Sequence, residues 1–350
     1  MNNGQETADM ARDEKMTSRE RVRAILEGKE SDRAAVVCPG GMMSLAVTEV
    51  MDATGMSWPR AHAEGETMKG LSLAMQEATG FDNLAAPFCM TVEAEAYGAE
   101  VELGDRTRHP RVKRSIMQAG ETGRLPTPRF EEGRARTLVE VIRELRKERP
   151  DLAVVGNVVG PFSLLGSLWD ALTLLKAARR RPETVEGPLD EVTEELAGFA
   201  ARQVEAGADA VCIAEPTATG EILGGELFGR LVSPRLGRIA RRVREAGGKV
   251  IVHICGDARG TMGELARLEA EAVSFDSMVD IVGVAGSGMG WQAMGNVDAF
   301  LLERGPEEVI RRRCEGLRKG GVRLIAPACG VVTTTPVRHL RAMRRSAEAH

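Results

Sequence analysis

Short apolar runs that end in glycine, proline or an acidic residue alternate with longer amphipathic stretches over most of the chain. The short runs are typical of buried strands, and the longer stretches of helices with one face on a core. Eight strands are expected, at residues 34–41, 83–90, 152–160, 208–216, 249–257, 272–277, 290–296 and 322–330. Helical periodicity occurs between them at residues 63–79, 134–148, 163–180, 186–206, 234–246 and 306–319. This alternation predicts an α/β fold of the (β/α)8 or TIM-barrel type, with a doubly wound open sheet as the alternative.

Two further features complete the predicted organisation. Thr17-Ser18-Arg19-Glu20 has the pattern of a capping box and predicts a helix ahead of the first strand. The stretch from about Thr91 to Thr127 is expected to form a hairpin insertion. We therefore predict a loosely ordered tail at residues 1–15 and a single barrel domain at residues 16–350, with an N-terminal helical extension and a hairpin insertion.

Composition narrows the classes of function. The net charge is only −4 and aromatic residues make up 3% of the chain, so neither a basic surface nor a set of stacking platforms for nucleic acid is expected. No apolar run is long enough to cross a membrane, and the polar, acidic start is unlike a signal peptide. These features predict a cytoplasmic protein. The 6 cysteines are scattered, which favours reduced thiols over disulfides.

The run VHICGD, residues 252–257, places two soft metal-binding side chains close together. On a strand His253 and Cys255 point to the same side, because side chains alternate between faces. In a barrel, Cys329 at the end of the eighth strand would meet them at the C-terminal mouth. Two thiolates and one imidazole suit zinc, with a fourth position open. Ordinary core packing of these residues is an equally strong alternative at this point.

The remaining polar and thiol side chains near strand ends are candidates of lower rank. Asp276 and Glu215 end the sixth and fourth strands, and each could be a fourth metal ligand, a group that orients His253, or a solvated loop carboxylate. Asn157 near the end of the third strand either lines the pocket or forms a turn. The other cysteines, Cys38, Cys89, Cys212 and Cys314, are expected to be structural.

Several short motifs together resemble the uroporphyrinogen decarboxylase superfamily, and within it the methylcobamide:coenzyme M methyltransferase branch. They span nearly the whole chain from Met16. The main ones are His253-Ile254-Cys255-Gly256, Pro327-Ala328-Cys329-Gly330 followed by Thr335-Pro336, Gly160-Pro161-Phe162, Glu215-Pro216-Thr217-Ala218, Met16-Thr17-Ser18-Arg19-Glu20-Arg21 and Thr91-Val92-Glu93-Ala94-Glu95-Ala96.

This resemblance implies a (β/α)8 barrel that holds zinc through His253, Cys255 and Cys329. It also implies the reaction, which is methyl transfer from a methyl-Co(III) corrinoid, presented by a partner protein, to a thiol such as coenzyme M in one-carbon metabolism. Tetrahydrofolate is the alternative acceptor.

Two readings from other classes remain. A metal-free, uroporphyrinogen-decarboxylase-like lyase would need an arginine-rich segment after the first strand, where this chain has Cys38-Pro39-Gly40-Gly41-Met42-Met43-Ser44. A non-catalytic corrinoid-protein-binding subunit would have no need of the thiol pair.

Overall fold

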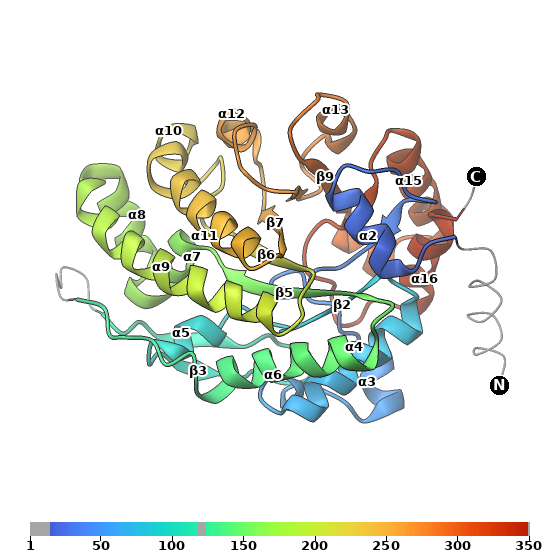
Figure 1. The fold of residues 1–350 in the computed structure, drawn as a ribbon, viewed down its shortest axis with the longest axis horizontal. Helices are drawn as coiled ribbons and strands as arrows, with labels where there is room; N and C mark the ends of the chain where they lie inside the picture. The colour runs from blue at the N-terminus through green and yellow to red at the C-terminus, as the bar shows by residue number, and fades with distance from the viewer. Residues whose placement is uncertain (1–14, 118–123, 349–350) are drawn as a thin grey trace.

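A barrel of parallel strands lies at the centre of the computed structural model, which describes residues 15–117 and 124–348 (Figure 1). The strands follow one another in the order β1-β10-β9-β8-β7-β6-β5-β2, and each neighbouring pair is parallel. Their bounds are β1 Ala35–Val36, β2 Asn83–Ala85, β5 Ala153–Val159, β6 Ala210–Glu215, β7 Lys249–Ile254, β8 Ala272–Phe275, β9 Gln292–Val297 and β10 Leu324–Pro327. A separate antiparallel pair, β3 Glu100–Glu102 and β4 Arg111–Arg114, forms the hairpin.

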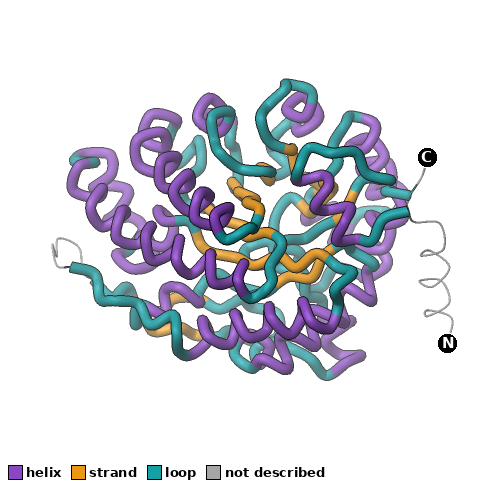
Figure 2. Tube along the Cα trace, in the orientation of Figure 1, coloured by secondary structure: helices purple, strands orange, loops and turns teal. Residues whose placement is uncertain are grey.

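Helices surround the strands on the outside, as Figure 2 shows. The longer ones are α2 Ser18–Leu26, α4 Gly65–Thr79, α6 Gly133–Glu148, α7 Pro161–Trp169, α8 Ala171–Arg180, α9 Glu183–Glu205, α11 Ser233–Glu245, α15 Glu307–Lys319 and α16 Val337–Ser346. Shorter helices are α3 Thr48–Thr54, α5 Val92–Ala96, α10 Gly225–Leu227, α12 Met262–Leu265, α13 Ile281–Ala285 and α14 Ala299–Arg304, with single turns η1 Arg60–His62, η2 Phe228–Val232 and η3 Arg259–Thr261. None of the helices in the described part of the chain is long and apolar enough to cross a membrane.

Side chains close the seam between β1 and β2. The backbone N–H of Val36 donates to the Asp82 carboxylate at 2.8 Å, and the N–H of Cys38 donates to Asn83 Oδ1 at 2.8 Å. Asn83 Nδ2 in turn donates to the Cys38 carbonyl at 2.9 Å. These side chains replace part of a backbone ladder, and they satisfy polar groups that burial would otherwise leave unpaired.

The buried carboxylate of Asp82 is balanced by two guanidinium groups. Arg21 and Arg33 lie 2.9 and 2.8 Å from it, and the Asp82 and Arg21 side chains are fully buried. Burial alone would raise the pKa of Asp82, but the hydrogen bonds and charges of the arginines outweigh it and lower that pKa. The helical extension α2, which carries Arg21, is therefore fastened to the bottom of the barrel.

Most of the predicted organisation is confirmed. The eight strands, the hairpin insertion and the (β/α)8 barrel are present, so the doubly wound alternative is wrong. The capping box at Thr17 and Glu20 is formed, and both of its hydrogen bonds are present. Apart from Lys15, the tail predicted at residues 1–15 lies outside the described residues.

The single helix predicted over residues 163–180 is wrong in one respect, because the structure breaks it at Asp170. Asp170 has φ of 98°, and its carboxylate accepts a hydrogen bond of 2.9 Å from the N–H of Thr173. A non-glycine residue rarely adopts such a backbone angle, which ends α7 and starts α8. The two helices change direction there, above the open end of the barrel.

Candidate active site

His253 and Cys255 come from β7 and from the residue that follows its end. His253 pairs in register with Ser274 of the neighbouring strand β8, and the Ser274 hydroxyl lies 3.1 Å from His253 Nδ1. That contact fixes the orientation of the imidazole ring. The other nitrogen, Nε2, is buried and has no hydrogen-bond partner among the described residues. A buried imidazole nitrogen without a partner is costly unless it binds something else.

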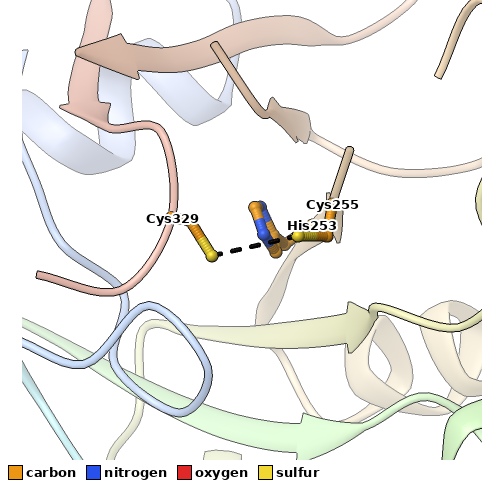
Figure 3. A group of neighbouring side chains, drawn as sticks. All are labelled: His253, Cys255 and Cys329. Carbon is orange, nitrogen blue, oxygen red and sulfur yellow. Dashed lines mark hydrogen bonds between the residues drawn. The ribbon is translucent and has the colours of Figure 1, made fainter. Parts of the chain in front are cut away.

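Cys329 reaches the same place from the loop after β10, as Figure 3 shows. Its sulfur lies 3.9 Å from that of Cys255, and the ligand atoms of His253, Cys255 and Cys329 all lie within 4.8 Å of one another. We call these three residues the His–Cys–Cys cluster. Two sulfurs bound to one tetrahedral zinc ion would be about 3.8 Å apart. The separation and the donor set therefore fit zinc.

The two thiols influence each other strongly. A hydrogen bond from Cys255 lowers the pKa of Cys329, and the same interaction together with burial raises the pKa of Cys255. One sulfur is thus favoured as the thiolate, while the other keeps its proton. A divalent cation would displace that proton, because thiolates and not thiols bind metal ions.

Asp276 lies beside the cluster, directly after β8. Its Oδ2 atom is 3.7 Å from Cys255 Sγ and accepts a hydrogen bond of 3.2 Å from the N–H of Gly256. The carboxylate is partly buried and near enough to the sulfurs to affect their charge. Its predicted role as a fourth ligand remains a prediction.

Glu215 is placed differently from the expectations. The expected solvated loop carboxylate is wrong, because Glu215 is fully buried at the start of α7. It accepts hydrogen bonds from the N–H of Phe162 (2.8 Å) and from the N–H and hydroxyl of Ser163 (3.1 and 2.6 Å). Burial raises the pKa of Glu215 to about 7, although these hydrogen bonds oppose the rise. Glu215 therefore fastens the start of α7 to the end of β6.

Asn157 lies within β5 and not in a turn. Its Nδ2 atom donates to the carbonyls of Pro39 and Ala86, at 2.6 and 3.2 Å. The Asn157 carboxamide also fills the space where a Cβ on Gly41 would lie, 2.6 Å from that position. Asn157 thus holds the loop after β1 against the barrel, and it is not among the residues that line the cavity described next.

A cavity of about 790 Å³ opens beside the cluster. This volume is within the range of small-molecule pockets. Cys329 is in its wall, together with the loops after β1 and β2, the hairpin, and the junction of α7 and α8. The full lining is Gly41, Met42, Cys89, Met90, Thr91, Thr107, His109, Pro110, Arg111, Val112, Lys113, Ser115, Gly166, Ser167, Asp170, Ala171, Cys329, Gly330, Val331, Val332 and Thr333.

Sequence reasoning missed two parts of this site. Ser274 gave no signal, because a serine within an apolar run is common; only its register with His253 reveals the contact. Cys89 was expected to be structural, and it is buried, yet it also lines the cavity. Cys38, Cys212 and Cys314 are buried as expected.

The fold and the site together define a (β/α)8 barrel with a candidate zinc cluster at the C-terminal mouth. A family model described as uroporphyrinogen decarboxylase (URO-D) matches residues 17–350. The chain belongs to this family, and within it to the branch of the methylcobamide:coenzyme M methyltransferases.

Three relatives are similar over almost their whole length. The methylcobamide:CoM methyltransferase MtaA of Methanosarcina barkeri is 29% identical, over 93% of this chain and 96% of its own. The methylcobamide:CoM methyltransferase MtbA of Methanosarcina acetivorans is 30% identical over the same shares. A solved methyltransferase structure from Methanosarcina mazei has a TM-score of 0.89 and 28% identity, and the match covers 95% of this chain and 99% of that one.

Proposed function

We propose that residues 16–350 form one catalytic barrel that transfers a methyl group from a methylated corrinoid protein to a thiol acceptor with the help of zinc. The observation that carries this proposal is the His–Cys–Cys cluster, with its matching sulfur separation and its unpartnered imidazole nitrogen, beside a cavity whose wall includes Cys329. The names of the methylcobamide relatives support coenzyme M as the acceptor, and they give no support to tetrahydrofolate.

The cluster would hold the metal through His253 Nε2 and the two sulfurs. When bound, zinc would lower the pKa of the acceptor thiol and keep its sulfur nucleophilic at neutral pH. Two protein thiolates would offset the charge of the ion. The acceptor sulfur bound to it would therefore stay electron-rich enough to attack, and the site would favour this reaction over hydrolysis by a Lewis acid. Ser274 would keep the imidazole in the tautomer that leaves Nε2 free to bind, since its hydroxyl meets Nδ1.

The proposed methyl transfer is a displacement at carbon. The acceptor sulfur forms a bond to the methyl carbon while the carbon–cobalt bond breaks, and both bonding electrons stay on cobalt, which goes from Co(III) to Co(I). The cavity lies beside Cys329, so an acceptor in it can approach the cluster while the corrinoid comes from the open mouth. Alignment of sulfur, methyl carbon and cobalt is what the barrel would contribute.

A decarboxylase acting on a polycarboxylate is less well supported. Such a substrate needs several cations, but among the described residues of the cavity lining the arginine and lysine side chains are those of Arg111 and Lys113. Both side chains are exposed and already paired, Arg111 with Glu102 at 2.8 Å and Lys113 with Glu100 at 3.0 Å.

The function is tested by incubating the zinc-loaded protein with methylcobalamin and coenzyme M, and following the loss of the methyl–cobalt absorption. We expect the thiol to be methylated only when the full-length protein is present. Tetrahydrofolate in a parallel reaction should not be methylated. The proposal would be contradicted if the metal-loaded protein failed to demethylate methylcobalamin with either acceptor, both in the absence and in the presence of a corrinoid protein.

A further inference from the structure

A buried guanidinium lies directly behind the cavity wall. The Arg134 side chain is about 6% exposed and extends inward from the start of α6. Its Nη1 atom donates to Thr91 Oγ1 at 3.1 Å, and its Nη2 atom donates to Cys89 Sγ at 2.8 Å. Its Nε atom donates to the carbonyl of His62 at 2.6 Å. Thr91 and Cys89 both line the cavity, so the cation is separated from it by these two side chains.

The charge of Arg134 is poorly balanced by neighbouring carboxylates. Among the described residues its ion pair is with Glu95, at a long 3.5 Å, and the Glu95 side chain is 37% exposed. The buried Glu93 is also nearby, but burial raises its pKa to about 7, so a substantial part of it is protonated at neutral pH. Burial and the charge of Arg134 lower the pKa of His62 to about 3, so that imidazole is neutral. A buried cation without a full counter-charge favours an anion near it.

Thr91 can pass this preference to a ligand. Its hydroxyl oxygen accepts the hydrogen bond from Arg134, which leaves the hydroxyl proton available. Among the described residues the acceptor of that proton is Cys89 Sγ, at 3.6 Å, and a cysteine sulfur is a weak acceptor. A ligand oxygen in the cavity would be a better acceptor, and the hydrogen bond would be strengthened by the guanidinium behind it.

We propose that Thr91, backed by Arg134, binds the anionic end of the methyl acceptor and so selects thiols that carry a sulfonate or carboxylate. This inference rests on the proposed function, and it assigns the specificity of the same cavity. The His–Cys–Cys cluster would take the sulfur and the wall formed by Thr91 and Arg134 the negative charge. The acceptor is thereby held at both ends.

The test compares three thiols: 2-mercaptoethanesulfonate, 3-mercaptopropionate and the neutral 2-mercaptoethanol. Thr91→Val removes the hydroxyl with little change in shape, and Thr91→Ser restores it. Thr91→Val should raise KM for the sulfonate by about tenfold or more, the worth of one charge-assisted hydrogen bond, and leave KM for 2-mercaptoethanol and kcat almost unchanged. If Thr91→Val leaves KM for 3-mercaptopropionate unchanged, as expected for 2-mercaptoethanol, the site is specific for sulfonate.

Thr193→Val is the matched control, because Thr193 is a buried threonine on α9 whose hydroxyl donates to the carbonyl of Leu189, and it does not line the cavity. It should leave all three KM values near those of the wild type. Equal changes with charged and neutral thiols in Thr91→Val, or no change at all, would overturn the inference. Arg134→Met is a harsher test, since loss of its contacts with two loops can impair folding, and for that reason the Thr91 pair carries the argument.

A binding measurement separates this inference from the proposed function. Ethanesulfonate has no thiol, so its contact with the protein can be followed by saturation-transfer NMR without any methyl transfer. Binding that is present in the wild type, Thr91→Ser and Thr193→Val, and lost in Thr91→Val, supports the anion site even if no thiol is methylated. If the wild type methylated all three thiols with equal KM and gave no ethanesulfonate signal, the inference would be contradicted and the proposed function would stand.

Discussion

The two ends of the cavity are built in different ways. At one end the His–Cys–Cys cluster is carried by strand ends and the first residues after them, and Ser274 holds His253 from the neighbouring strand. At the other end the wall comes from the hairpin, the loop after β2 and the α7–α8 junction. Strand ends are fixed by the barrel ladder, and so suit a reaction that needs exact placement.

The wall depends on fewer and weaker constraints. The hairpin is joined to itself by exposed ion pairs such as Lys113 with Glu100, which contribute little to stability in water. Loops of this kind can change in sequence without disturbing the barrel. The comparison therefore assigns the chemistry to the strand ends and the choice of acceptor to the wall, and each of the following changes tests one side of it.

The largest effect is expected at the metal end. Cys329→Ser removes one sulfur ligand, so zinc retention and methyl transfer should each fall by more than about a hundredfold. Metal content and the methylcobalamin assay measure the two losses, and circular dichroism should show an intact fold. Cys314→Ser is the control, because Cys314 is buried on α15 and is not one of the three clustered residues. Full activity of Cys329→Ser, or zinc loss in Cys314→Ser, would mean that the ligands are assigned wrongly.

A smaller effect is expected from Ser274→Ala. It removes the hydroxyl that orients His253 but leaves all three ligands, so zinc affinity should drop by about 10- to 100-fold. Competition with a chromogenic chelator measures this. Ser346→Ala, which removes another buried hydroxyl on α16, is the control and should keep the affinity of the wild type. Unchanged affinity in Ser274→Ala would show that the ring needs no support from β8.

A further effect is expected in the pH dependence of folding at Glu215, which holds the start of α7, the helix whose other end forms part of the wall. Burial raises its pKa in the folded state to about 7, from an ordinary value of 4.5. The folded protein therefore holds this proton more tightly, and the stability it contributes is full below about pH 4.5 and lost as the pH rises through about 7. In Glu215→Gln this contribution is absent. The difference in unfolding free energy, wild type minus variant, should therefore fall by about 3 kcal/mol across that window.

Urea unfolding at a series of pH values measures that difference, and other carboxylates cancel because they are common to both proteins. Asp32, for example, acts in the opposite direction: its hydrogen bonds and ion pair with Arg21 lower its pKa to about 2 against the effect of burial. A difference that stays flat from pH 4.5 to 7, or that rises, would show that Glu215 is ionised throughout.

The sequence was informative where a residue type carries a chemical preference. His253, Cys255 and Cys329 could be picked out because sulfur and imidazole on converging strand ends favour a metal. The eight strands could be found because buried parallel strands are nearly continuous apolar runs. Both kinds of signal are local, and the barrel then brings the distant pieces together.

The remaining features depend on contacts between segments far apart in the chain. Glu215 ends β6 and Asp276 directly follows β8, so their positions in the sequence are similar. Glu215, however, turns toward the N-terminus of α7, where two backbone N–H groups and the Ser163 hydroxyl hold it. Arg134 reads as one more charge on an amphipathic helix, and only the folded chain shows that it is buried behind Thr91. The break at Asp170, where φ is 98°, leaves no mark in the hydrophobic periodicity, which favoured a single helix.

The central claim is that the His–Cys–Cys cluster holds zinc, and elemental analysis of the protein purified under reducing conditions tests it most directly. We predict about one zinc ion per chain, lost on replacement of His253 or Cys255 and regained by the wild type after chelation and reconstitution. A wild-type protein that contains no zinc and takes up none on reconstitution would contradict the account, and would return these three residues to an ordinary packing role.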